Sequence, residues 1–217
     1  MKNTRSSQFL ALLAASALSL AGAARADVPV LTEPDASAPR LVGSGLLGQT
    51  LGSFSYTFKN LDNTGVDIHS LDFEYSRAVE DGLDTFAAFN VGRSSKLAGG
   101  RLEEYGFDFG GRFYRHYRGV KPYWEIGLGW NWLRVPGNKD SSFIWQTAVG
   151  AEVPVATGLT MTPYVRYADA IDFRDGDRWF YGLQGNYWLN QRTALQAGLE
   201  RQDDRSWNWR FGVNFRY

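Results

Sequence analysis

Two histidines, His69 and His116, and no cysteine occur in the 217 residues, so histidine and thiol chemistry can be examined completely. His69 precedes Ser70, and a hydroxyl beside an imidazole is the pair that nucleophilic catalysis uses. Adjacent residues of a β-strand point to opposite faces, so this hydroxyl and imidazole cannot partner each other within a strand. The lack of cysteine excludes disulfides, cysteine-ligated zinc, iron–sulfur clusters and thiol catalysis.

Asp67 and His69 are two residues apart, and this spacing places both side chains on one face of a strand. That face also carries Leu71, Phe73 and Tyr75, which are suited to lipid or lipid headgroups and not to an internal groove. A proteolytic site would also need a facing pair of aspartates, for which Asp62 and Asp140 are the available guesses. We therefore expect a histidine near a loop with no catalytic role, and His116, among tyrosines and arginines, is expected at an interface.

Carboxylates are the remaining candidates for acid–base or cation chemistry. Basic residues accompany them on the same strand faces, which favours an internal salt-bridge network. The expected network comprises Lys59, Glu74, Asp108, Arg112, Glu125, Glu152, Arg166, Glu200, Arg210 and Arg216. Asp172, Asp175 and Asp177 form a short acidic loop that lacks the distal glutamate of a calcium loop, so a solvated turn is expected. We predict no catalytic residue, no metal site and no cofactor.

The chain opens with a segment typical of bacterial secretory signal peptides. Lys2 and Arg5 precede an apolar run over residues 9–20, and small residues at Ala24 and Ala26 predict cleavage before Asp27. The run is shorter than the ~20 residues that a transmembrane helix needs. Residues 1–26 are therefore assigned as a signal peptide, and the Pro-, Ala- and Gly-rich residues 27–48 as a flexible periplasmic lead-in.

From residue 49 to residue 217 apolar and polar residues alternate with a period of two. In the last segment Trp207, Trp209, Phe211, Val213 and Phe215 share one face, and Asn, Arg and Gly residues fill the positions between them. Such alternation indicates half-buried antiparallel strands and not helices. Turn-forming residues divide the region into ten expected strands, near residues 54–58, 71–75, 85–91, 105–113, 124–132, 143–153, 161–167, 179–189, 195–199 and 207–217.

The size of the side chains on the apolar face indicates whether that face lies inside the barrel or against lipid. The chain contains 8 Trp, 11 Tyr and 14 Phe, and a small soluble barrel could not hold so many rings inside. The opposite face carries Gly, Ala, Asn, Gln and charges of both signs, which suit a narrow polar interior. The sequence therefore predicts an all-β transmembrane up-and-down barrel, with a soluble β protein as the alternative.

The carboxy-terminal residues Phe211, Val213, Phe215 and Tyr217 resemble the assembly signal of outer-membrane proteins. Together with the leader and the alternation, the region after residue 48 resembles the small outer-membrane barrels of the OmpA-like, OmpX-like and opacity-type porin-fold family. Many members of that family have eight strands, so eight is the alternative to ten. The resemblance implies the outer membrane of a Gram-negative bacterium.

The expected role is structural or surface-interacting, without catalysis, in a barrel whose polar lumen is plugged. Expected partners are outer-membrane lipid, lipopolysaccharide and the outer-membrane assembly machinery. Zero formal net charge argues against nucleic-acid binding, and a monomer is expected. Two alternatives are an enzyme acting on lipid A or peptides, since His69-Ser70 and Asp67-x-His69 resemble pairs in outer-membrane lipid A deacylases and proteases, and a narrow channel for small solutes.

Overall fold

Ten β-strands make up the regular structure of the residues that the structure describes. The computed structural model describes residues 45–61, 65–95, 100–172 and 176–217. The predicted signal peptide and residues 27–44 of the lead-in lie outside the described residues. The strands are β1 Leu51–Leu61, β2 Val66–Glu80, β3 Leu83–Ser94, β4 Glu103–Tyr114, β5 Lys121–Val135, β6 Asn138–Ala156, β7 Leu159–Ala170, β8 Arg178–Trp188, β9 Thr193–Gln202 and β10 Trp207–Arg216.

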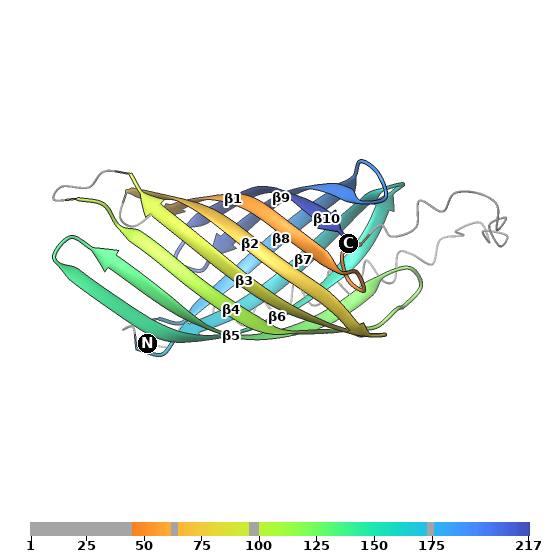
Figure 1. The fold of residues 1–217 in the computed structure, drawn as a ribbon, viewed down its shortest axis with the longest axis horizontal. Helices are drawn as coiled ribbons and strands as arrows, with labels where there is room; N and C mark the ends of the chain where they lie inside the picture. The colour runs from red at the N-terminus through yellow and green to blue at the C-terminus, as the bar shows by residue number, and fades with distance from the viewer. Residues whose placement is uncertain (1–44, 62–64, 96–99, 173–175) are drawn as a thin grey trace, which may run out of the picture. The chain divides into compact units, whose positions relative to one another are not determined.

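The strands form one closed antiparallel barrel in which each strand pairs with its neighbours in sequence (Figure 1). Closure is made by β1, which pairs with both β2 and β10: Phe54 lies opposite Phe73 on one side and Val213 on the other. The prediction of an all-β barrel with ten strands is thereby confirmed, and the eight-strand alternative is wrong. The weakly alternating first segment is a full member of the sheet.

The connections divide between two ends of the barrel. The terminal end carries the start of β1, the end of β10, and the turns at residues 81–82, 115–120, 157–158 and 189–192. The distal end carries the connections at residues 62–65, 95–102, 136–137, 171–177 and 203–206. Both β-bulges, at Ala78–Glu80 and at Pro154–Ala156, lie near the terminal end. No helix among these residues is long and apolar enough to cross a membrane.

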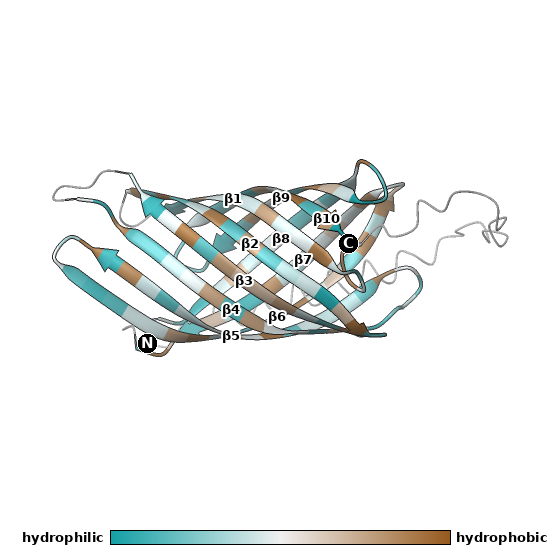
Figure 2. Cartoon of the chain, in the orientation of Figure 1, coloured by the Kyte–Doolittle hydropathy of each residue, from teal (hydrophilic) through white to brown (hydrophobic). Residues whose placement is uncertain are grey.

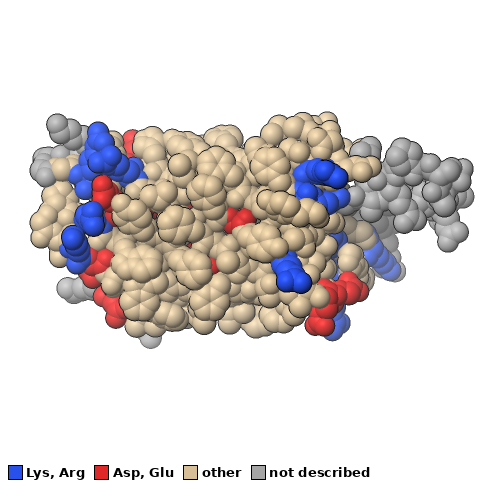
Figure 3. Space-filling model, in the orientation of Figure 1, with Lys and Arg blue, Asp and Glu red and all other residues tan. Residues whose placement is uncertain are grey.

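The distribution of side chains is the reverse of that in a water-soluble protein. The largest fully buried side chains in the described residues are polar: Asn186, Asn214, Thr160, Asp84, Ser70, Ser142 and Ser206. The exterior is aromatic, with Phe73, Phe109 and Trp124 each about half exposed. Polar and apolar bands alternate along the strands (Figure 2), and the middle of the visible face carries few charges (Figure 3). Such an exterior is stable only where lipid covers it.

Candidate functional site

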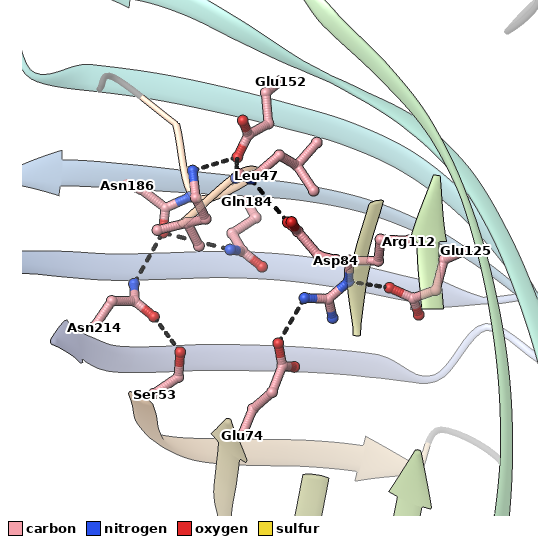
Figure 4. A network of polar contacts seen from close by, with 12 residues as sticks. Leu47, Ser53, Glu74, Asp84, Arg112, Glu125, Glu152, Gln184, Asn186 and Asn214 are labelled. Carbon is pink, nitrogen blue, oxygen red and sulfur yellow. Dashed lines mark hydrogen bonds and ion pairs between the residues drawn. The ribbon is translucent and has the colours of Figure 1, made fainter. Parts of the chain in front are cut away.

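The lumen holds the charged residues that face inward, and Arg112 is central among them. Its Nη1 lies 2.7 Å from Glu74 Oε1 and its Nε lies 2.5 Å from Glu125 Oε2, so one guanidinium on β4 joins β2 to β5 (Figure 4). The guanidinium also stacks on Phe86, 4.5 Å from the ring centroid. The two carboxylates thus share one cation, which offsets the cost of holding them in a confined interior.

A second ion pair joins β7 to β9. Arg166 Nη2 lies 3.0 Å from Glu200 Oε2, and its Nη1 donates to Gln146 Oε1 at 3.1 Å. Glu200 also accepts hydrogen bonds from Tyr164 Oη (2.9 Å) and Asn208 Nδ2 (2.8 Å). These partners lie on β7 and β10, so the Glu200 carboxylate on β9 links three strands inside the lumen.

The other members of the expected network are placed differently from one another. Lys59 pairs with Glu104 at 2.7 Å, a partner that the sequence analysis did not name. Arg210 Nε donates to Thr57 Oγ1 at 3.4 Å. Asp108 lines the lumen without a hydrogen bond or ion pair to any residue that the structure describes. Arg216 stacks on Trp188 at 4.2 Å and likewise forms no ion pair within the described part of the chain.

Glu152 belongs to a separate arrangement at the terminal end, where residues 45–50 fold against the inner wall. We call these residues the clasp. Glu152 Oε1 accepts hydrogen bonds from the N–H groups of Leu46 (2.5 Å) and Leu47 (3.1 Å), and Lys121 Nζ donates to the Leu47 carbonyl (2.6 Å). Figure 4 shows Leu47 beside Glu152. Leu47 is only 5% exposed, so an apolar side chain is held inside the barrel mouth.

The clasp is also fixed to β3. The N–H of Gly48 donates to Asp84 Oδ2 at 2.8 Å. Gly48 has φ +81°, and a Cβ there would lie 2.8 Å from the Tyr114 hydroxyl, so both the backbone and the space require glycine. The segment therefore leads into β1 through a tight turn at Gly48.

Beside the clasp lies a layer of uncharged amides. Ser53 Oγ donates to Asn214 Oδ1 (2.5 Å), and Asn214 Nδ2 donates to Asn186 Oδ1 (3.2 Å), as Figure 4 shows. A cavity of about 440 Å³ fills the rest of the lumen, with Leu46 and Leu47 among its lining at one end and Arg178 at the other. The cavity therefore reaches from the clasp toward the distal end.

The histidine candidates lie outside this lumen. His69 is exposed on the exterior, where its Nδ1 contacts the Tyr56 hydroxyl and its ring lies 5.3 Å from that of Phe58, while Ser70 is buried on the inner face. His116 lies at the terminal end, 3.8 Å from Asp81. Asp62, one guessed partner of His69, is outside the described residues. Within the described residues, neither histidine forms a hydrogen bond with a serine or threonine hydroxyl, and the hydroxyl that His69 contacts is that of Tyr56 on the exterior.

Asp172 of the acidic loop binds to β6. Asp172 Oδ2 accepts from the N–H of Phe143 (3.3 Å), and its own N–H donates to Ser142 Oγ (3.0 Å). Asp175 is outside the described residues. Within the described ranges no group of three or more His, Asp or Glu side chains is arranged to hold a metal ion.

Sequence reasoning missed Glu104, Lys121, Asp72, Asp84 and the clasp. A signal existed for Glu104 and Asp72, because both alternate with outward aromatic residues and so face the lumen. The clasp had a weaker signal, the apolar pair Leu46–Leu47 within a glycine-rich stretch. Its position depends on carboxylates from β3 and β6, far away in sequence.

A closed antiparallel barrel with an aromatic exterior and a hydrogen-bonded polar interior defines a class of protein. Every backbone polar group of such a sheet is paired without an edge, which is what a lipid environment requires. The chain is a transmembrane β-barrel of the outer-membrane type.

Three solved structures to which the chain is similar in fold illustrate the likeness. The β-domain of the Bordetella autotransporter BrkA is 11% identical, with a TM-score of 0.48 over 78% of this chain and 100% of that one. The NanC porin is 8% identical, with a TM-score of 0.47 over 76% and 100%. Neisserial surface protein A is 10% identical, with a TM-score of 0.43 over 77% and 96%. No protein-family model matches the sequence, and no curated protein matches it significantly.

Proposed function

We propose that this protein is a non-catalytic outer-membrane barrel with a plugged lumen, serving envelope integrity or surface interaction. The observation that supports the proposal is the clasp, which is held at one mouth by hydrogen bonds to Glu152 and Asp84. The ion pairs of Arg112 and Arg166 line the cavity beyond it and narrow the path. In the proposed orientation the terminal end faces the periplasm, since outer-membrane barrels place both termini and their shorter turns there.

The proposed partners follow from this location. Outer-membrane lipid and lipopolysaccharide cover the aromatic exterior, and the assembly machinery reads Phe211, Val213, Phe215 and Tyr217. The protein acts as a monomer and binds no nucleic acid in this proposal. The signal peptide over residues 1–26 directs export.

Planar-bilayer conductance tests the plugged lumen. We expect refolded residues 27–217 to give no uniform channel openings, because the clasp and the ion pairs block the path. The double variant Asp84→Ala/Glu152→Ala removes the acceptors of three clasp N–H groups and should produce frequent openings. The matched control Glu80→Ala/Asp81→Ala removes two exposed carboxylates at the same end and should stay closed. Uniform, stable channels from the unaltered protein would overturn the proposal.

The cavity of about 440 Å³ favours one second candidate, a narrow channel for small solutes, and the same recording distinguishes it. The enzymatic alternative is tested by mass spectra of lipid A from wild-type and deletion cells. We expect identical spectra, and a lipid A species lost on deletion would contradict the non-catalytic role.

A further inference from the structure

Four charged side chains gather on the outer surface at the distal end, on four neighbouring strands. Cross-strand pairing places Arg93 on β3 opposite Glu103 on β4, Glu103 opposite Arg134 on β5, and Arg134 opposite Lys139 on β6. We call these four residues the distal basic cluster. Figure 3 shows Lys and Arg side chains at this end of the visible face, with Asp and Glu side chains among them.

The cluster carries more positive than negative charge. Glu103 is its only acid, and that carboxylate is shared by Arg93 Nη2 (3.6 Å) and Arg134 Nη1 (3.3 Å). Lys139 forms no ion pair with any residue in the described ranges. Asp140 follows it in sequence but belongs to the lumen-facing alternation, and its carboxylate accepts the Ser141 N–H at 2.9 Å. Three cations therefore face one carboxylate.

Arg134 and Lys139 are like charges directly opposite each other, an arrangement that destabilises an antiparallel pair. Their strands are ~4.8 Å apart, so a single phosphate group can contact both side chains. The side chains of Arg93 and Arg134 are 58% and 54% exposed, so the guanidinium groups are open to a ligand from outside. A bound anion would offset the repulsion between Arg134 and Lys139.

The outer surface beside the distal basic cluster is apolar and aromatic. One outward step toward the middle of the barrel, the same strands present Val91, Tyr105 and Trp132. One step further they present Phe89, Phe107 and Trp130. Trp130 and Trp132 are 39% and 46% exposed. A ligand that satisfies both zones has phosphate groups at one end and acyl chains at the other.

We infer that the distal basic cluster binds the phosphate groups of lipopolysaccharide, whose acyl chains cover the aromatic rows below it. This inference rests on the proposed function only through the orientation that faces the distal end outward. Arg134 and Lys139 hold a phosphate between them, and Arg93 adds a third positive charge. Glu103 orients the two arginines and reduces the net attraction.

Native mass spectrometry of the refolded full-length mature protein tests the inference, with rough-type lipopolysaccharide and the same preparation dephosphorylated as probes. We expect Arg134→Ala/Lys139→Ala to weaken binding of the phosphorylated probe about thirtyfold, since each surface cation near anionic lipid contributes about fivefold. Glu103→Gln should strengthen it about fivefold, a direction that loss of structure would not produce. The control Arg77→Ala/Arg115→Ala, two exposed arginines at the terminal end, should bind as the wild type does.

The inference would be overturned if the wild type bound the phosphorylated and dephosphorylated probes equally. It would also be overturned if the wild type and the Arg134→Ala/Lys139→Ala variant bound the phosphorylated probe equally. If the terminal-end control lost binding and the distal variant did not, the lipopolysaccharide site would lie at the terminal end, and both the inference and the proposed orientation would be wrong. Heat-modifiable migration on gels verifies that each variant is folded. Conductance tests the plugged lumen and native mass spectrometry tests the lipopolysaccharide site, so the failure of one proposal can be distinguished from the failure of the other.

Discussion

Arg112 shows how much a single residue can do in this barrel. Its guanidinium neutralises two carboxylates that lie on strands three apart in the sheet, and it stacks on Phe86 in the same position. The Arg112 side chain is only 19% exposed. If it is removed, water therefore solvates the two carboxylates poorly. A residue that engages two acids and a ring in a narrow interior is costly to lose.

We predict that Arg112→Leu lowers the free energy of unfolding by about 3 kcal/mol, because Glu74 and Glu125 lose their shared cation. Urea unfolding in lipid vesicles, followed by tryptophan fluorescence, measures the change. The control Arg77→Leu, at an exposed position, should cost less than about 0.5 kcal/mol. The triple variant Arg112→Met/Glu74→Gln/Glu125→Gln should recover most of the loss; if it does not, shape and not charge determines the effect.

At the scale of the element, β4 shows how small residues give the lumen its room. Gly110 on β4 lies opposite Gly127 on β5, and the Phe86 ring from β3 occupies the space above them. A Cβ at Gly110 would lie 2.1 Å from the Ile126 carbonyl oxygen and 2.8 Å from the Phe86 ring. The next residue, Gly111, has no heavy atom nearer than 3.7 Å to its Cβ position.

This contrast yields a paired prediction. Gly110→Ala should destabilise the barrel by about 2 kcal/mol, because overpacking forces β4 and β5 or Phe86 to move. Gly111→Ala should change stability by less than about 0.5 kcal/mol, since the added methyl group makes only ordinary contacts. Urea midpoints of the two variants provide the measurement. Equal effects at both positions would mean that glycine matters here through strand propensity alone.

At the scale of the whole molecule, the protein depends on its surroundings. Phe215 and Tyr217 are 46% and 83% exposed, so neither contributes much to packing within the chain. Phe215 pairs with Gly52 of β1 and Thr193 of β9 at the seam where the barrel closes. Exposed aromatic residues at the last strand are available to a partner before the sheet closes.

We predict that Phe215→Ala/Tyr217→Ala sharply reduces the heat-modifiable form in outer-membrane fractions, because the assembly machinery loses its signal. Refolding of the same variant into lipid vesicles should be close to normal, since the substituted rings pack little within the barrel. The control Phe89→Ala/Phe113→Ala removes two rings with 45% exposure each from other strands and should assemble normally. Normal assembly of the carboxy-terminal variant in cells would contradict the signal assignment.

The sequence alone determined where the strands lie and the face that each residue takes, whereas the pairing of β1 with β10 decided between ten strands and eight. Alternation is a local property: from Trp207 to Phe215, period two separates outward rings from inward Asn and Arg without knowledge of any other strand. Turn-forming residues mark the strand ends in the same local way, and the described hairpins follow them, as at Asp81–Gly82.

Only the tertiary structure decided which inward residues meet. Lys59 on β1 reaches Glu104 on β4, and Arg166 on β7 reaches Glu200 on β9, across distances set by the diameter and stagger of the closed sheet. The same closure brings Asp84 and Glu152 to one mouth, where the backbone of Leu46, Leu47 and Gly48 binds them. The alternation of inward and outward residues is a property of each strand alone. Contacts across the lumen form only when ten strands have closed around it.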